Sequence, residues 1–167
     1  MTVYHLDEIA GDVRIALDQN TTSDVLKEIG DVDTLALNDI IKSKIIEAVK
    51  CVHSSAPPYL LDGGHNFGDE VYWQKCESGW VLLPEDFMRF VVFQMSDWER
   101  AVFYPINVDD PEYEKQSSRF KGIRGTTQRP VCAISIRPEG RVLEFYSCKS
   151  QDATVSRAVY LPYPKID

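Results

Sequence analysis

The sequence predicts an α+β fold in which N-terminal helices pack on an antiparallel β-sheet or small sandwich, followed by an extended C-terminal tail. Two observations support this fold class. Apolar residues recur at helical spacing in the first part of the chain, as far as residue 58. From residue 59 onward, β-branched and aromatic residues are punctuated by Gly, Pro and acidic turns, as antiparallel sheets require.

A chain of 167 residues can bury a sizeable core, and no linker or low-complexity tract divides the sequence. We therefore expect a single domain over residues 1–167. Within it, residues 1–58 form the helical part, residues 59–160 form the antiparallel β part with one short helix, and residues 161–167 form the extended tail.

Helices are expected at three places in the helical part. Residues 6–18 carry apolar residues three and four apart, which places them on one stripe. Residues 24–29 show a weaker helical pattern. The strongest helix begins near Asn38, a good N-cap, with Asp39 favoured in its first turn, and Pro57-Pro58 stops it. Its apolar face consists of Ile41, Ile45, Ala48, Val49 and Val52.

The β part is predicted as a series of strands joined by turns. Residues 71–75 and 80–83 read as a hairpin, because Cys-Glu-Ser-Gly separates them. Strands over residues 87–95 and 100–104 follow, and a last strand covers residues 155–161. The two prolines that come next exclude a helix and cannot donate to a central ladder, which predicts the extended tail.

A short helix interrupts the strands. Asp110 is a good N-cap, Pro111 suits the first helical position, and Glu112 places an acid in the first turn. A helix is therefore expected from here to about Arg119. Together with Asp109 and Glu114, these acids form a crowded carboxylate segment. Because crowding along the chain shows no convergence in a pocket, we interpret them as a capped, solvated helix rather than an acid–base pair.

A firm hairpin is expected where residues 131–136 and 141–148 surround Arg137-Pro138-Glu139-Gly140, since Pro presets its dihedral and Gly is free to take positive φ. Its register stays open between two alternatives. A two-residue loop sets Ile134 opposite Phe145, whereas a three-residue loop with a Gly bulge sets Ala133 there.

Composition excludes several function classes. The net charge of -8 argues against a dedicated nucleic-acid binder, whose affinity comes from Lys and Arg neutralising phosphates. No apolar run approaches the ~20 residues that span a bilayer, and residues 1–5 do not resemble a secretory signal. We therefore expect a soluble protein with reduced thiols. Its four cysteines lack CxxC spacing, which predicts no zinc site: Cys51, Cys76, Cys132 and Cys148.

No residue pattern predicts catalysis, a metal site or a cofactor. Cys51 and His53 lie two apart on one predicted helix, roughly 200° from each other, so they form no nucleophile–base pair. We read them as a core Cys and a helix-end His whose imidazolium complements the helix dipole. Residues 63–69 are rich in Gly but lack the Lys and Ser/Thr of a phosphate loop, and His65 in this loop is not a preorganised ligand. We therefore expect no enzyme.

One basic concentration stands out, namely Arg119, Lys121, Arg124 and Arg129 beside Phe120 in a loop rich in Gly and Ser/Thr. Charges on such a loop can steer assembly by contacting phosphates or an acidic neighbouring subunit. Because the chain as a whole is acidic, contact with a protein is favoured over contact with DNA. The alternative interpretation is a solvated loop.

The C-terminal segment is aromatic and stiff, and an extended peptide of this kind loses little entropy when it docks on a partner. We expect it to be a partner contact, although its large apolar side chains can instead pack on their own sheet. Among the tryptophans, Trp98 lies in a predicted turn and is the one expected to be exposed. The contact residues of the tail are Tyr160, Leu161, Pro162, Tyr163, Pro164 and Ile166.

An apolar strand enters a Pro turn at the segment LPEDFMR, residues 83–89, and leaves as another strand. This corner, the helices before it and the strands after it resemble the small head-to-tail connector proteins of tailed phages, also called adaptor, ring or neck proteins. The resemblance covers residues 37–166. The segments SDW, SSRFKGIRG and YLPYPKI are further similar to a ring protein of the crAss-like phages of gut Bacteroidales. The familiar connector pattern is more helical than this chain.

This resemblance implies a structural virion protein of the neck or tail, made in the host cytoplasm. Its subunits would form a closed ring, commonly a dodecamer, between the portal protein and another neck or tail protein. The ring would line the DNA exit channel, touch passing DNA only non-specifically, and bind no membrane or small-molecule substrate. The alternative is a β-rich binding or interaction module of a cellular protein that recognises a peptide or carbohydrate through exposed aromatic residues.

Overall fold

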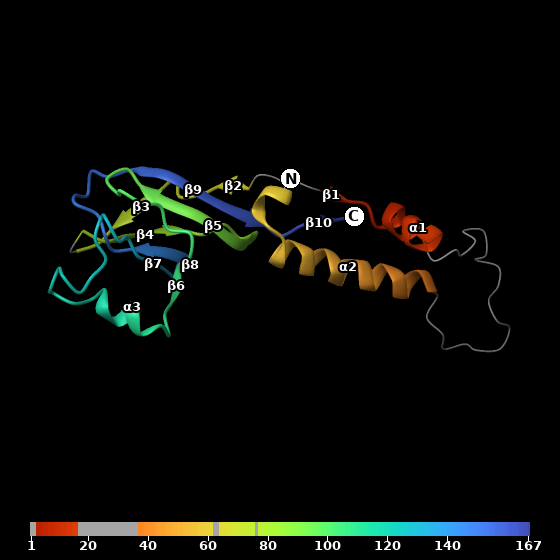
Figure 1. The fold of residues 1–167 in the computed structure, drawn as a ribbon, viewed down its shortest axis with the longest axis horizontal. Helices are drawn as coiled ribbons and strands as arrows, with labels where there is room; N and C mark the ends of the chain where they lie inside the picture. Colours follow the sequence, from red (N-terminus) through yellow and green to blue (C-terminus); the bar gives the residue numbers. More distant parts are fainter. Residues whose placement is uncertain (1–2, 17–36, 62–63, 76) are drawn as a thin grey trace. The chain divides into compact units, whose positions relative to one another are not determined.

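The computed structural model describes residues 3–16, 37–61, 64–75 and 77–167 and confirms the α+β class, with helices first and most strands later (Figure 1). The chain divides into two compact units. The helical unit comprises Met1–Asp62 together with Tyr163–Asp167, and the β unit comprises Gly63–Pro162. The helical part therefore runs slightly past residue 58, and the last residues of the chain belong to it.

The helical unit contains α1 (Leu6–Ala16) and α2 (Leu37–Ser55), followed by the short 3-10 helix η1 (Pro58–Leu60). α1 begins as predicted, whereas the expected helix over residues 24–29 lies outside the described residues. α2 begins at Leu37, so the prediction of Asn38 as N-cap is wrong. Leucine is a stronger helix former than asparagine. The helix takes in Leu37 and Asn38, two residues more than an N-cap at Asn38 would allow.

The core of the helical unit follows one stripe along each helix. Ile41 and Ile45 are buried against Ala10, and four partly buried residues pack around them: Leu6, Ile9, Val13 and Val49. Ala48 and Val52, expected on the same face, are exposed. The stripe thus repeats every fourth residue, and its next member is the buried His53.

A two-stranded parallel ladder joins β1 (Val3–Tyr4) to β10 (Lys165–Ile166). A hydrogen bond of 2.9 Å connects the Tyr4 hydroxyl to Nε2 of His53 beneath the ladder. Burial lowers the pKa of His53, which disfavours the imidazolium form. His53 lies in the last turn of α2 as expected, and its burial works against the charged form that would complement the helix dipole.

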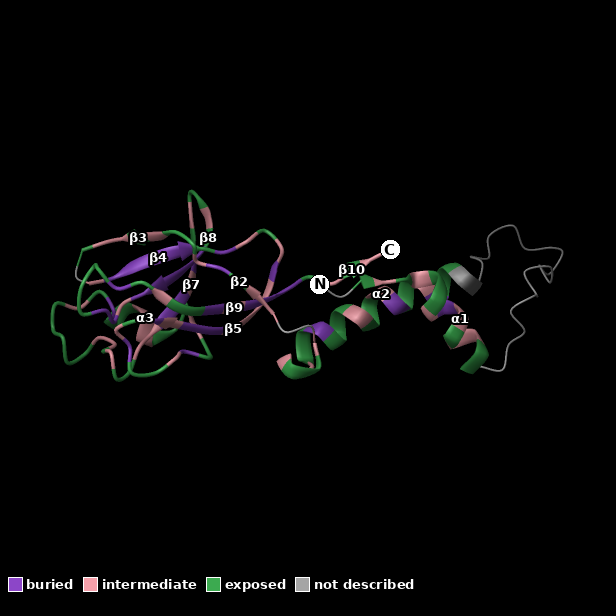
Figure 2. Ribbon diagram, turned by 90° about the horizontal axis from the view of Figure 1, so that it is seen from above, coloured by how far each residue is buried: buried purple, intermediate pink, exposed green. Residues whose placement is uncertain are grey.

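The β unit consists of two sheets that pack face to face, because one core cluster takes residues from both (Figures 1 and 2). The three-stranded sheet has the order β2-β9-β5, made of His65–Asn66, Val155–Pro162 and Phe87–Met95. The five-stranded sheet has the order β3-β4-β8-β7-β6, made of Val71–Trp73, Gly79–Leu82, Gly140–Phe145, Cys132–Arg137 and Ile106–Asn107. Residues 63–69 are thus not wholly a loop, since His65 and Asn66 pair with β9.

The Pro corner at residues 83–86 carries the chain from one sheet to the other. β4 ends in the five-stranded sheet and β5 begins in the three-stranded sheet. Phe87 donates a backbone hydrogen bond to the carbonyl of Pro84 at 3.1 Å, and Leu83 donates to the carbonyl of Arg141 at 2.9 Å. This corner therefore sets the two sheets of the β unit against each other.

Two predicted elements are shorter than expected. No strand forms over residues 100–104, where Val102 alone makes a bridge to Phe93. The helix α3 (Pro111–Lys115) is capped by Asp110 as predicted but ends before Arg119. The Ser117 hydroxyl donates to the carbonyl of Glu114 at 2.7 Å, a local bond that competes with continued helix.

The hairpin of β7 and β8 adopts neither predicted register. Cys132 lies opposite Phe145, and Arg137 lies opposite Gly140, so the loop is Pro138-Glu139. The reason is the turn chemistry, since Pro is favoured at the second position of a turn and Gly at the fourth. Gly140 takes φ 133, a conformation that L side chains rarely adopt.

Trp98 is buried, with 5% of its surface exposed, which corrects the expectation of an exposed aromatic in this turn. The turn folds back because Trp98 donates its backbone N–H to the carbonyl of Met95 at 3.1 Å. Its ring packs edge-to-face on Phe93 and Phe145, with centroids 5.7 Å and 6.4 Å apart. Aromatic pairs of this geometry add stability beyond the area that they bury.

We expect Trp98→Ala to lower the free energy of unfolding by about 3–5 kcal/mol, because it removes a large side chain from a packed core. The matched control is Tyr104→Ala, since Tyr104 is 89% exposed and should change stability by less than about 0.5 kcal/mol. Urea denaturation followed by far-UV circular dichroism measures both. Equal effects of the two substitutions would contradict the burial of Trp98.

Candidate functional site: an anchored basic loop

The most connected polar group of the described residues is the buried carboxylate of Glu144 on β8, which is 5% exposed. It accepts hydrogen bonds from the Ser135 hydroxyl at 2.8 Å and from Nε and Nη2 of Arg137 at 3.0 and 2.7 Å. The Tyr113 hydroxyl donates at 3.0 Å, and the Tyr146 hydroxyl donates as well. Every partner is a donor, so the site favours the ionised form of the carboxylate.

Electrostatics agree with this geometry. Burial raises the pKa of Glu144, and hydrogen bonds from Tyr146, Ser135, Arg137 and Tyr113 lower it, with a net shift downward. Burial also raises the pKa of the Tyr146 hydroxyl, which stays protonated. The guanidinium of Arg137 lies over the ring of Trp80, 5.5 Å from its centroid. Glu144 is therefore a saturated acceptor with no proton to donate, which suits a structural anchor better than a catalytic acid.

This anchor fixes α3 to the five-stranded sheet through Tyr113. One turn further on, the buried Gln116 donates to the carbonyl of Glu112 at 3.0 Å and accepts from the backbone N–H of Gly125 at 2.9 Å. A Cβ atom on Gly125 would lie 2.5 Å from the Ser147 hydroxyl, so only glycine fits this approach of the loop to the sheet. The segment between Gln116 and Gly125 is thus held at both ends.

The basic loop, residues 119–129, presents cations and apolar side chains together. Phe120 is 57% exposed and Ile123 is 49% exposed. The guanidinium of Arg119 lies 5.0 Å from the centroid of the Phe120 ring. Such exposed apolar residues beside cations are typical of a protein contact surface.

The structure brings together some of the predicted cations and separates others. Lys121 and Arg124 line one small hollow of 240 Å³. A third cation, Lys149, also lines it, and no pattern in the sequence predicts this. Nζ of Lys121 lies 3.5 Å from Oε1 of Glu77, an exposed pair that contributes little stability. Arg119 and Arg129 do not line this hollow, and both are exposed.

The other predicted contact residues fall into two groups. Tyr160 and Leu161 are buried in the β unit, where the Tyr160 hydroxyl donates to Asp86 at 2.8 Å, and the adjoining Pro162 is buried too. β9 runs to Pro162, so it includes Leu161 as the predicted last strand does, and it also takes in Pro162, which the prediction placed in the tail. From Tyr163 onward, the segment belongs to the helical unit and Tyr163 itself is exposed.

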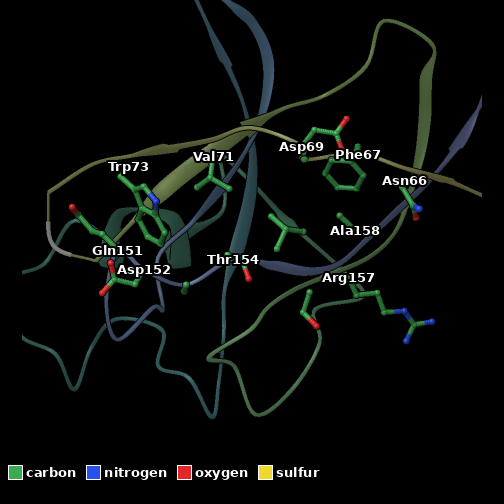
Figure 3. Close-up of a pocket in the computed structure, with 14 residues that line it drawn as sticks. Asn66, Phe67, Asp69, Val71, Trp73, Gln151, Asp152, Thr154, Arg157 and Ala158 are labelled. Atoms are coloured by element: carbon green, nitrogen blue, oxygen red, sulfur yellow. The ribbon is translucent and has the colours of Figure 1, made fainter.

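A second hollow, of 630 Å³, lies beside β3 and the start of β9 (Figure 3). Trp73 and Val71 of β3 lie along one side of it, and Thr154 lies across from them. Polar groups surround these side chains, among them Asp69, Gln151, Asp152 and Arg157. A hollow with one aromatic wall and several hydrogen-bonding side chains can hold a small polar molecule.

The cysteines and histidines form no reactive group among the described residues. Cys51 is exposed, which corrects the expectation of a core cysteine, whereas its neighbour His53 is buried. Cys132 and Cys148 are buried free thiols, and burial raises the pKa of Cys148 to about 12. In the described ranges, no three His, Cys, Asp or Glu side chains lie close enough to hold a metal ion. No described helix is long and apolar enough to cross a membrane.

Comparison with known proteins gives no match to a protein-family model, to a curated protein or to a solved structure.

We expect Glu144→Gln to lower the free energy of unfolding by about 2 kcal/mol at neutral pH, because it leaves Arg137 without its anionic partner. A carboxyl whose pKa is lowered by folding stabilises the fold above its unfolded pKa, and this contribution disappears as the pH falls through the folded pKa. The difference between wild type and variant should therefore shrink below the ordinary carboxyl value of 4.5. Denaturation over a pH series measures it.

The control for this comparison is Glu99→Gln, a change at an exposed position. It should alter stability by less than about 0.5 kcal/mol at any of these pH values. A constant gap between wild type and Glu144→Gln across the acid range would show that Glu144 is not stabilised as an anion.

Proposed function

We propose that this chain is a structural subunit of a head-to-tail connector ring, which joins the portal of a tailed phage to its tail and lines the DNA exit channel. The resemblance of residues 37–166 to connector proteins suggests the class. The observation that carries the proposal is the basic loop, an anchored and exposed patch of cations and apolar side chains on an otherwise acidic chain. Such a patch fits an acidic surface on a neighbouring copy.

A ring requires a contact between two unlike surfaces, because head-to-tail contacts close into a ring when the rotation between subunits closes. The basic loop supplies one surface. The net charge of -8 means that acidic surface is plentiful elsewhere on each copy, for example at Asp109 and Glu114. Complementary charges steer such an encounter and fix its register.

Exposed apolar side chains in the helical unit also favour assembly. Its described core buries only Ala10, Ile41 and Ile45, a small set for a unit with two helices. Large apolar side chains remain exposed in its described part: Ile15, Ile40, Val52, Tyr59 and Leu60. These side chains are available for contact with a neighbouring copy.

An acidic chain also suits the task of a channel. DNA must slide through a connector without adhering to it, and a surface of like charge repels the phosphate backbone. The same charge argues against tight, specific DNA binding.

We expect the triple variant Arg119→Glu, Lys121→Glu, Arg129→Glu to shift the protein from closed rings to monomers, with at least a tenfold loss in apparent association constant. The reason is that like charges would then meet across the contact. Mass photometry measures the distribution, and negative-stain electron microscopy shows whether the wild-type oligomer is a closed ring. Added salt should weaken wild-type assembly, because exposed charges are screened.

The matched control reverses three cations away from the loop, all at exposed positions: Lys50→Glu, Arg100→Glu and Arg157→Glu. It changes the net charge by the same amount, so it separates an effect of the loop from general repulsion. Rings that persist in the loop variant would contradict the proposed contact, and a wild-type protein that never forms a ring, alone or with a portal, would contradict the function.

A second candidate function, carbohydrate recognition, is favoured by the hollow beside β3. Sugars bind proteins through an aromatic wall together with carboxylate and amide side chains, and the hollow combines Trp73 with Asp69, Gln151 and Asp152. This function belongs to the alternative in which the chain is a β-rich binding module.

If this second candidate is right, a glycan array should yield a ligand whose binding falls at least tenfold in Gln151→Ala, Asp152→Ala, because both substitutions remove hydrogen-bonding groups. The control, Glu99→Ala, lies outside the hollow and should bind as wild type. An array without any bound glycan would exclude this candidate and leave the connector proposal untouched.

A further inference from the structure

We propose that the arm, residues 163–167, is exchanged between copies, so that β10 of one subunit pairs with β1 of its neighbour. This inference rests on the proposed ring and names the element that links one subunit to the next. The occupant of the β1 edge is a second copy of this chain, because the arm already carries the pairing partner that β1 accepts.

The ladder that would be exchanged is small and consists mainly of backbone bonds. Val3 lies opposite Lys165 and Tyr4 lies opposite Ile166. Asp167 donates its N–H to the carbonyl of Tyr4 at 2.9 Å, and its own carbonyl accepts from Leu6 at 2.8 Å. An arm from a neighbouring copy can make the same contacts, so the exchange loses no interaction and is a low-cost route to association.

The connection into the arm is stiff. It leaves the β unit at Pro162 and passes through Tyr163 and Pro164 before β10 begins. Each proline fixes its own φ, and each disfavours helical conformation in the residue before it. Such a segment stays extended, so it can reach β1 of a neighbouring copy as it reaches β1 of its own chain. The residues just before the arm are fixed in place, because Tyr160 and Leu161 are buried in the β unit.

The position of β1, with which the arm pairs, does not depend on the arm. The Tyr4 hydroxyl bonds to His53 of α2 at 2.9 Å, and the two rings meet edge-to-face with centroids 5.5 Å apart. His53 is buried at the end of the apolar stripe of α2. β1 is therefore tied to its own helix by contacts that remain when an arm leaves, and its pairing edge is then open to another arm.

The test uses cysteine cross-linking between chains that each carry one half of the ladder. Cys51 and Cys76 are changed to Ser, and the two remaining cysteines are buried. One chain carries Val3→Cys and a second, larger tagged chain carries Lys165→Cys, both at exposed positions. The two are co-expressed, purified together and treated with a short bis-maleimide. Because each chain has one half of the pair, a product of summed mass forms only by exchange.

The control pair is Gln94→Cys on one chain and Arg157→Cys on the other. These residues are opposite each other in the ladder of β5 and β9, which lies inside one β unit and is not exchanged. We expect at least ten times more summed-mass product from the Val3 and Lys165 pair than from this control. Far-UV circular dichroism of each variant confirms that it is folded.

A third sample carries Val3→Cys and Lys165→Cys on the same chain, and its oligomeric mass is measured before cross-linking. A ladder of covalent multimers supports exchange. An oligomer that cross-links only within single chains overturns exchange while leaving the proposed ring intact. A protein that stays monomeric both alone and with a portal, and cross-links only within its own chain, overturns both.

Discussion

The buried carboxylate of Glu144 determines where the basic loop of the β unit lies. A charge removed from water is tolerated only when it is paired and fully hydrogen-bonded. Here the donors come from β7, from α3 and from the segment after β8, so satisfying one carboxylate requires all three to be in place. The position of the basic loop follows from this requirement. Tyr113 ties α3 to Glu144, and Gln116, just after α3, holds the loop through the backbone of Gly125. A loop with no core of its own is thereby given a defined location.

Local residue patterns predicted much of the fold. β5 was predicted with its observed ends, and Asp110 is the N-cap of α3, because both depend on short-range rules. Burial depends instead on which segments meet in space. Trp98 lies in a segment with the residues of a turn, but its ring packs on aromatic residues of two strands, β5 and β8. The register of the β7–β8 hairpin likewise depends on which residues of the Pro-Gly turn form the loop.

The candidate site could be predicted only in part, for the same reason. The cluster of Arg and Lys around Phe120 is visible in the sequence, whereas its anchor is not. Glu144 stands in the apolar run Val-Leu-Glu-Phe as the one acidic residue of the strand predicted over residues 141–148, and this is the one signal that the sequence offers. Ser135 and Arg137 become its neighbours only through the observed hairpin register, which is neither of the two that the sequence predicts. The tail shows a similar limit, because its first residues complete β9 and its last residues pair with β1.

Two contacts of different physical character are proposed for the ring, and their combination matters more than either alone. The basic loop acts through charge, which steers the encounter but is screened by salt and contributes modestly once subunits have met. The arm acts through backbone hydrogen bonds that are nearly indifferent to salt, yet a ladder of two residue pairs is too short to hold subunits together by itself. When both join the same neighbours, forming the first makes the second effectively intramolecular, and the combined affinity exceeds that of either contact. Subunits joined in this way would remain free while dilute and become firmly linked once the ring closes, because the last subunit gains both contacts on both sides.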